Sequence, residues 1–117
     1  MSRDEHDRQV DYIEFPATDI GAIKQFYGTV LDWKFTDYGP DYTSFEDGRL
    51  SGGFTTTAQV ASPGPLVVIY ASNLDDVRKR VFSAGGTVTQ EPYEFPGGRR
   101  FHFRDPSGNE LAVWSEN

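Results

Sequence analysis

The sequence contains no cysteine. This excludes disulfides, thiolate nucleophiles and zinc sites built on cysteine. It also lacks any run of about 18 apolar residues, the length that a membrane-spanning helix needs. Positive charge is scarce, with 11 Lys and Arg against 18 Asp and Glu and a formal net charge of −7. Nucleic acid and anionic membrane surfaces, which attract clustered basic residues, are therefore poor partners.

The first ten residues, MSRDEHDRQV, lack the apolar core of a signal peptide. We expect them to be a polar lead-in, with His6 on the surface of a cytoplasmic protein. What the sequence does contain is aromatic residues, which make up 15% of its 117 residues. Phe, Tyr and Trp bury much area per side chain, so this length can build one domain with one core.

The order of predicted elements occurs twice along the chain. Module one, residues 9–57, has a strand at 10–15, a helix capped by Thr18 or Asp19, and strands at 33–35, 42–46 and 50–57. A turn-rich linker, residues 58–65, follows. Module two, residues 66–116, has a strand at 66–71, a helix that Asn73 caps and Gly85-Gly86 ends, and strands at 87–90, 99–104 and 110–115. Modules of about 50 residues bury little alone. We therefore predict a single α+β domain, residues 1–117.

Two segments carry a resemblance to a known family. The opening VDYIEFPATDIGAIKQFYGTVLDWKF, residues 10–35, and the closing FRDPSGNELAVW, residues 103–114, resemble the vicinal oxygen chelate superfamily. That superfamily includes glyoxalase I, extradiol dioxygenases and bleomycin resistance proteins. The resemblance implies two βαβββ modules in a curved, half-open barrel of mixed sheet, with the ligand in its concave face. It also implies a homodimer, with the modules arranged either within one chain or across two.

Enzymes of the family hold a divalent metal at four strand positions, usually with His, Glu or Gln. We counted seven residues back from each helix cap and seven forward from the turn residues Asp47 and Asp105. This count identifies those positions as Tyr12, Phe54, Leu66 and Ala112. Three of these side chains cannot bind a metal, and a neutral tyrosine binds one poorly. We therefore predict no metal site of the family's usual kind and no cofactor.

The remaining candidate is a cavity lined mainly by aromatic and apolar side chains. Side chains alternate along a strand, so residues two apart share a face. The predicted ligand-binding residues are Tyr12, Glu14, Phe54, Leu66, Val68, His102, Ala112 and Trp114. These side chains could instead fill the core between the sheets. Arg99, Arg100 and Arg104 could hold one carboxylate or remain solvated.

The sequence favours a metal-free protein that binds a small apolar or aromatic molecule. One alternative is a metal-independent isomerase or lyase with Glu14 or His102 as general base. A salt bridge from Glu14 to Arg100 or Arg104 would argue against the first of these roles. Another alternative is a metal-dependent glyoxalase- or dioxygenase-like enzyme with displaced ligands from Glu14, His102 and Glu110. A further alternative is an interaction module with no ligand.

Overall fold

The computed structural model describes residues 3–60 and 64–116, with the side chains of residues 3 and 4 excepted. The middle of the predicted linker, residues 61–63, lies outside the described residues. A short 3-10 helix, η1 (Arg3–His6), precedes the first module, whose elements are β1 (Tyr12–Pro16), α1 (Ile20–Val30), β2 (Lys34–Asp37), β3 (Tyr42–Glu46) and β4 (Ser51–Thr55). The elements of the second module are β5 (Val67–Tyr70), α2 (Leu74–Ser83), β6 (Thr87–Phe95), β7 (Gly98–Arg104) and β8 (Glu110–Ser115).

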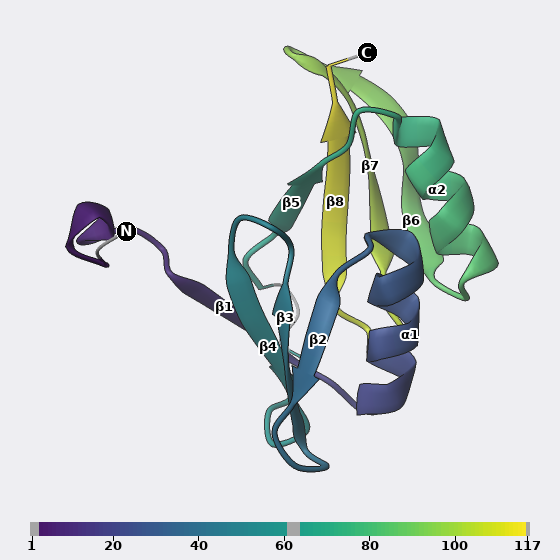
Figure 1. Ribbon diagram of the computed structural model, residues 1–117. Coiled ribbons are helices and arrows are strands. Elements are labelled where there is room, and N and C mark those ends of the chain that lie inside the picture. The colour runs from purple at the N-terminus through teal and green to yellow at the C-terminus, as the bar shows by residue number, and fades with distance from the viewer. Residues whose placement is uncertain (1–2, 61–63, 117) are drawn as a thin grey trace.

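The strands form two sheets of the same topology (Figure 1). Sheet A has the order β1-β4-β3-β2, and sheet B has the order β5-β8-β7-β6. In each sheet the first two strands of that order are parallel and the others antiparallel. The prediction of an α+β fold with two βαβββ modules is confirmed, and the two sheets are not closed into a barrel.

Both helices begin at a predicted cap. The Asp19 side chain accepts a hydrogen bond from the Ala22 N–H at 3.1 Å, and the Asn73 side chain accepts one from the Asp76 N–H at 3.0 Å. Such side chains satisfy N–H groups that have no partner within the helix. Gly85 ends the second helix at φ +88°, a conformation that favours glycine. Within the described ranges, neither helix is long and apolar enough to cross a membrane.

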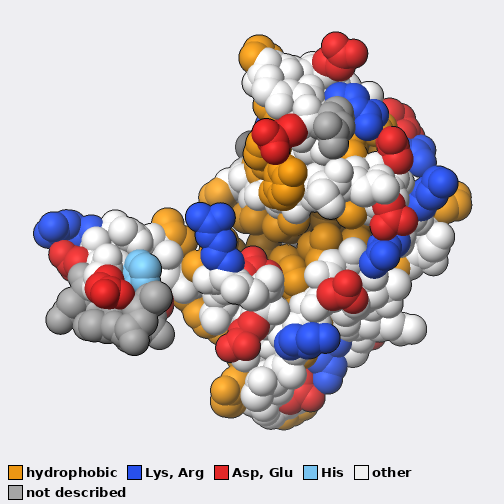
Figure 2. All heavy atoms as spheres, turned by 45° about the horizontal axis from the view of Figure 1, so that its top comes forward, with side chains coloured by type: hydrophobic (Ala, Val, Ile, Leu, Met, Phe, Trp, Pro, Cys, Tyr) orange, Lys and Arg blue, Asp and Glu red, His pale blue; other side chains and the backbone are white. Residues whose placement is uncertain are grey.

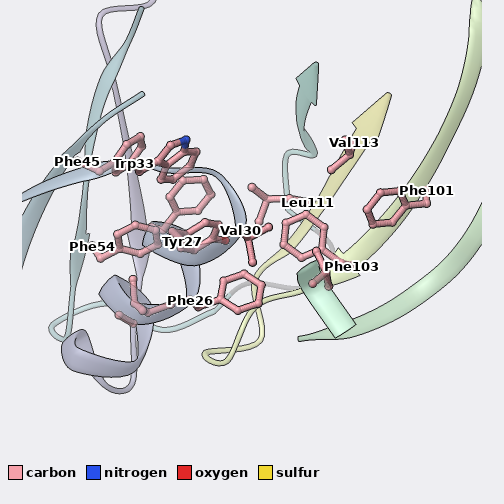
Figure 3. Close-up of a cluster of buried hydrophobic side chains, with 14 of the residues drawn as sticks. Phe26, Tyr27, Val30, Trp33, Phe45, Phe54, Phe101, Phe103, Leu111 and Val113 are labelled. Atoms are coloured by element: carbon pink, nitrogen blue, oxygen red, sulfur yellow. The ribbon is translucent and has the colours of Figure 1, made fainter. Parts of the chain in front are cut away.

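One hydrophobic core extends across both modules (Figure 3). On the sheet A side, the Trp33 ring stacks between Tyr27 and Phe45, with ring centroids 4.7 and 4.2 Å away. On the other side of α1, Phe26 packs against Phe103 of β7 at 5.9 Å. The helix therefore contributes to the core on both sheets, which is why neither module forms a separate core.

The turn after β7 joins the two modules by hydrogen bonds. The buried Asp105 carboxylate accepts from the Tyr27 hydroxyl of α1 at 2.8 Å. Asn109 donates through Nδ2 both to that carboxylate and to the carbonyl of Pro16 in β1, at 3.0 and 2.8 Å. The Ser107 hydroxyl oxygen accepts from the Thr18 N–H at 2.9 Å. Burial raises the pKa of Asp105, and its hydrogen-bond donors counter part of that effect.

Strand β6 differs most from its predicted bounds. It continues to Phe95 instead of ending at residue 90, and its pairing with β7 shifts register twice, between Val88 and Gln90 and between Gln90 and Tyr93. Pro92 lies inside the observed strand, and it has no N–H to donate to a neighbouring strand. Proline is tolerated here because β6 is an edge strand with bulges. The longer strand places Tyr93 and Phe95 beside β7.

Candidate functional site

Each sheet has one face in the core and one open face. On sheet A, the open face carries Tyr12 and Glu14 of β1, which pair in register with Ser51 and Gly53 of β4. Tyr12 is 42% exposed. Tyr12 and Glu14, which are two residues apart on β1, therefore lie on the same face of the sheet, and their part in binding a ligand stays a prediction.

Three of the polar side chains on this open face form a hydrogen-bonded chain. The Tyr42 hydroxyl donates to Glu14 Oε2 at 2.8 Å. Because that proton is committed, the Tyr12 hydroxyl must donate to the Tyr42 oxygen. Burial, followed by the bonds to Tyr12 and Glu14, raises the pKa of Tyr42 far above its ordinary value. Glu14 therefore has a tyrosine as its partner, and the alternative considered above, a salt bridge to Arg100 or Arg104, does not form.

At two adjacent glycines of β4, neighbouring groups pack directly against the backbone, on opposite faces of the sheet. A Cβ on Gly53 would lie 2.1 Å from the Tyr42 hydroxyl oxygen, on the open face. A Cβ on Gly52 would lie 2.2 Å from the carbonyl oxygen of Ile13 and 2.4 Å from the Phe45 ring, in the core. The strand pairs without a register shift, so close approach rather than a bulge explains this glycine pair.

Alanine substitution at these two glycines should have unequal effects. Gly52→Ala should lower the free energy of unfolding by about 2–3 kcal/mol, because a backbone carbonyl and a buried ring must move. Gly53→Ala should cost about 1 kcal/mol or less, because the groups that it meets are the far ends of tyrosine side chains on the open face, which can rotate away. Urea denaturation measures both, with Gly28→Ala as control because a Cβ there meets nothing within 4 Å. Equal losses of unfolding free energy in Gly52→Ala and Gly53→Ala would contradict the assignment of Gly52 to the core face and Gly53 to the open face.

Phe54 was predicted to line the cavity with Tyr12, and this prediction is wrong. Phe54 is fully buried on the core face, with its ring 5.2 Å from Phe15 and 5.3 Å from Tyr27. The two hairpin turns differ in length, which explains the error. The Asp47 N–H bonds to the carbonyl of Leu50, three residues on, whereas the Asp105 N–H bonds to that of Asn109, four residues on. A count of seven therefore reaches the open face only in module two.

The open face of sheet B carries a row of large side chains, one from each strand. Direct pairing aligns Tyr70 of β5 with Trp114 of β8, Trp114 with Arg100 of β7, and Arg100 with Tyr93 of β6. The Trp114 ring lies 5.1 Å from Tyr70 and 6.2 Å from Phe95, edge to face in both cases. Tyr70 is 51% exposed. We call these five residues, with Phe95 included, the aromatic row.

The next row of this face contains Val68, Ala112, His102 and Gln90. Val68 is 41% exposed, whereas the Ala112 methyl group is fully buried beneath its neighbours. Ala112 and Trp114 share the open face as predicted, but Ala112 offers no exposed surface.

His102 belongs to a chain of hydrogen bonds that fixes its tautomer. A carboxylate can only accept, so His102 Nδ1, which lies 3.3 Å from Glu110 Oε2, carries the proton of the neutral imidazole. Nε2 is then an acceptor for the Tyr93 hydroxyl, 3.0 Å away, and the Tyr93 oxygen accepts from Arg100 Nε in turn. The order of donation is Arg100, Tyr93, His102, Glu110.

A cleft of about 430 Å³ is lined by residues of both sheets. Its lining includes Glu14 from β1, Leu66 before β5, His102 from β7 and Glu110 from β8. Figure 2 shows a hollow with hydrophobic side chains at the centre of one face and charged side chains around it. The cleft thus brings Glu14, Leu66 and His102 of the predicted site together. It does not include Tyr12, Phe54, Val68, Ala112 or Trp114 among its lining residues.

The residues at the family's metal positions do not fit a divalent metal. With the count corrected for turn length, these positions hold Tyr12, Gly53, Leu66 and Ala112, of which three have no side-chain donor atom. Among the residues that the structure describes, no three His, Asp or Glu side chains group closely enough to hold a metal ion. Of the displaced ligands considered above, only His102 and Glu110 are in contact.

The sequence analysis missed Tyr42, Tyr93 and Phe95, and it left the three arginines of β7 unresolved. Strand alternation now separates them: Arg99 pairs with Asp75 of α2 at 3.3 Å, whereas Arg100 lies in the aromatic row. Alternation from His102 could have indicated this. Tyr93 could not be found that way, because it lies beyond the predicted end of its strand at residue 90.

Residues 9–113 match the Glyoxalase/Bleomycin resistance protein/Dioxygenase superfamily. The anthracycline biosynthesis protein DauV of Streptomyces sp. (strain C5) is 32% identical over 88% of this chain, which spans 45% of that relative's length.

Solved structures also share the fold. A glyoxalase/bleomycin resistance protein/dioxygenase family enzyme from Burkholderia phytofirmans PsJN has a TM-score of 0.80 at 18% identity, covering 92% of this chain and 100% of the other. The fosfomycin resistance protein FosX from Mesorhizobium loti has a TM-score of 0.78 at 15% identity, with 92% of each chain covered.

Proposed function

Because the chain belongs to the glyoxalase/bleomycin resistance protein/dioxygenase superfamily, we propose that it binds a planar aromatic small molecule without a metal. The observation that carries this proposal is the aromatic row, in which half-exposed rings stand on the open face beside the cleft. Large rings exposed together and edged by a few polar groups are typical of a small-molecule site. The similarity to a protein named for anthracycline biosynthesis agrees with a flat aromatic ligand.

A thermal-shift screen against planar aromatic compounds tests this proposal. A ligand at about 100 times its Kd should stabilise the protein by about 2.7 kcal/mol, which raises Tm by about 10 °C. Trp114→Ala should abolish the shift and Trp114→Phe should retain part of it. Phe82→Ala, which removes an exposed ring from α2, is the matched control and should leave the shift unchanged. The absence of a shift with every compound, or an unchanged shift in Trp114→Ala, would contradict the proposal.

A second candidate function is metal-independent proton transfer, and the chain Arg100–Tyr93–His102–Glu110 favours it. His102 Nε2 is positioned to take the Tyr93 proton while Glu110 holds the imidazole, so Tyr93 could accept a proton from a bound ligand in turn. His102→Asn and Glu14→Gln separate the two candidate bases. Proton exchange at the bound ligand, followed by NMR in deuterated water, should stop in His102→Asn and persist in Glu14→Gln. Exchange that survives both substitutions would remove this candidate.

We also propose that the protein is a homodimer. Outside the aromatic row, the open faces expose large apolar side chains from both sheets, Tyr12 and Val68 among them, and such patches often mark an interface. Light scattering should give about twice the monomer mass of 13.1 kDa. A monomer at high protein concentration would contradict this.

A further inference from the structure

Arg100 differs from the other arginines of its neighbourhood in having no acidic partner. On α2 and β7, Arg78 pairs with Glu91, Arg80 with Asp76, Arg99 with Asp75 and Arg104 with Glu110, at 2.7, 3.0, 3.3 and 3.9 Å. In the part of the chain that the structure describes, no carboxylate lies within ion-pair distance of Arg100.

Aromatic groups surround the Arg100 guanidinium instead. Its Nε donates to the Tyr93 hydroxyl, and its Cζ lies 5.7 Å from the centre of the Tyr93 ring and 5.9 Å from that of Phe95. These contacts fix the plane of the guanidinium and remove part of its water shell. The four N–H groups on its two Nη atoms keep their donor capacity. A positioned fork of this kind matches the two oxygens of a carboxylate, at a low cost in side-chain entropy.

The pairing of the strands places the Arg100 side chain next to the rings of the aromatic row. Trp114 is its direct neighbour on β8, and Tyr70 is one strand further. Neighbouring strands lie about 4.8 Å apart. A flat ligand resting against Trp114 and Tyr70 would therefore hold a group attached to its edge about one strand spacing away, at the guanidinium. The acidity of the rest of the chain, with a net charge of −7, disfavours anions elsewhere on the surface.

We infer that Arg100 binds the carboxylate of a planar aromatic acid whose ring lies on Trp114 and Tyr70. This inference rests on the proposed function and narrows it from aromatic molecules in general to aryl carboxylates. The ligand's acid group forms two charge-assisted hydrogen bonds with the Nη atoms, and its ring system supplies the apolar contact.

The test compares 2-naphthoate with its neutral analogue 2-naphthamide by isothermal titration calorimetry. The wild-type protein should bind the acid about 10-fold or more tightly than the amide. Arg100→Gln should weaken naphthoate binding by about 10- to 100-fold and leave naphthamide binding within about 3-fold. The affinity of Arg100→Lys for naphthoate should lie between those of the wild type and Arg100→Gln, because lysine keeps the positive charge but cannot form two parallel hydrogen bonds. Arg99→Gln is the matched control, since Arg99 is the neighbouring arginine paired with Asp75 of α2, and it should bind both compounds as the wild type does.

Each outcome separates this inference from the proposed function. Equal affinity of the wild type for acid and amide would overturn the inference and leave aromatic binding intact. Binding of neither compound, nor of any other planar aromatic, would overturn both. An unchanged preference for the acid in Arg100→Gln would overturn the role of Arg100. If Arg99→Gln lost as much affinity for naphthoate as Arg100→Gln, the effect would be one of overall charge, and the role of Arg100 would also be overturned. The Tm of each variant without ligand identifies any that fails to fold. If Arg100→Gln does not fold, the affinities of Arg100→Lys for naphthoate and naphthamide decide the role of Arg100.

Discussion

Replacing Asp105 with alanine should lower the free energy of unfolding by about 3–5 kcal/mol. The buried carboxylate accepts from the backbone N–H groups of Ser107 and Asn109, from Asn109 Nδ2 and from the Tyr27 hydroxyl, at 2.8, 3.0, 3.0 and 2.8 Å. Alanine removes the shared acceptor of these four bonds at a position that is only 4% exposed, so water replaces them poorly. It also frees Asn109, which anchors the turn to Pro16 of the first module. The loss should therefore affect both modules at once.

Asp47→Ala is the matched control, because Asp47 occupies the corresponding turn of the first module. Its carboxylate accepts only from the N–H groups of Arg49 and Leu50, at 2.8 and 2.6 Å, and it is exposed. Water can replace those bonds, so the cost should be about 1 kcal/mol. Urea denaturation followed by circular dichroism measures both variants. If the two variants lose similar stability, the turn after β7 does not join the modules in the way described.

Phe54→Ala should have a comparable effect, lowering the free energy of unfolding by about 3–5 kcal/mol. Its ring is fully buried and stacks with Phe15 and Tyr27, so its removal leaves a cavity at the centre of the first module. Phe54→Leu, which keeps most of the volume, should recover part of the loss.

Two aromatic controls accompany this prediction. Phe82 is 74% exposed and Tyr12 is 42% exposed, so Phe82→Ala should change stability by about 0.5 kcal/mol or less and Tyr12→Ala by about 1 kcal/mol or less. Denaturation midpoints of the variants give the comparison. A small effect of Phe54→Ala, similar to that of Tyr12→Ala, would mean that Phe54 lines an open face after all.

Local signals in the sequence predicted the fold well. Helix caps at Asp19 and Asn73, the left-handed Gly85 and the repeated order of elements depend on short-range chemistry, and all are present in the structure. In the second module, alternation and a turn landmark were enough to place Val68, Ala112 and Trp114 on one face, whereas the faces of His102 and the arginines of β7 stayed open. The same count failed in the first module because its turn is one residue shorter, a difference that the hydrogen bonds of Asp47 and Asp105 reveal.

The candidate site was less predictable because it depends on pairing between strands. Nothing local indicates that Tyr93 stands beside Arg100, since that contact requires β6 to continue past Pro92 through a bulge. Nor does the sequence show that Tyr42, from β3, reaches Glu14 of β1 over Gly53. Both contacts are made between different strands, so they exist only when the strands have paired into sheets.

The most direct test of the proposed binding face is an NMR titration of the ¹⁵N-labelled protein with 2-naphthoate and, separately, with 2-naphthamide. We expect saturable shifts in the amides of β5, β7 and β8, largest around Tyr70, Arg100 and the Trp114 indole N–H with at least one of the two compounds. The indole N–H of Trp33, which is only 6% exposed in the core, should remain unchanged. No saturable shift with either compound, or shifts confined to sheet A or to Trp33, would contradict the account.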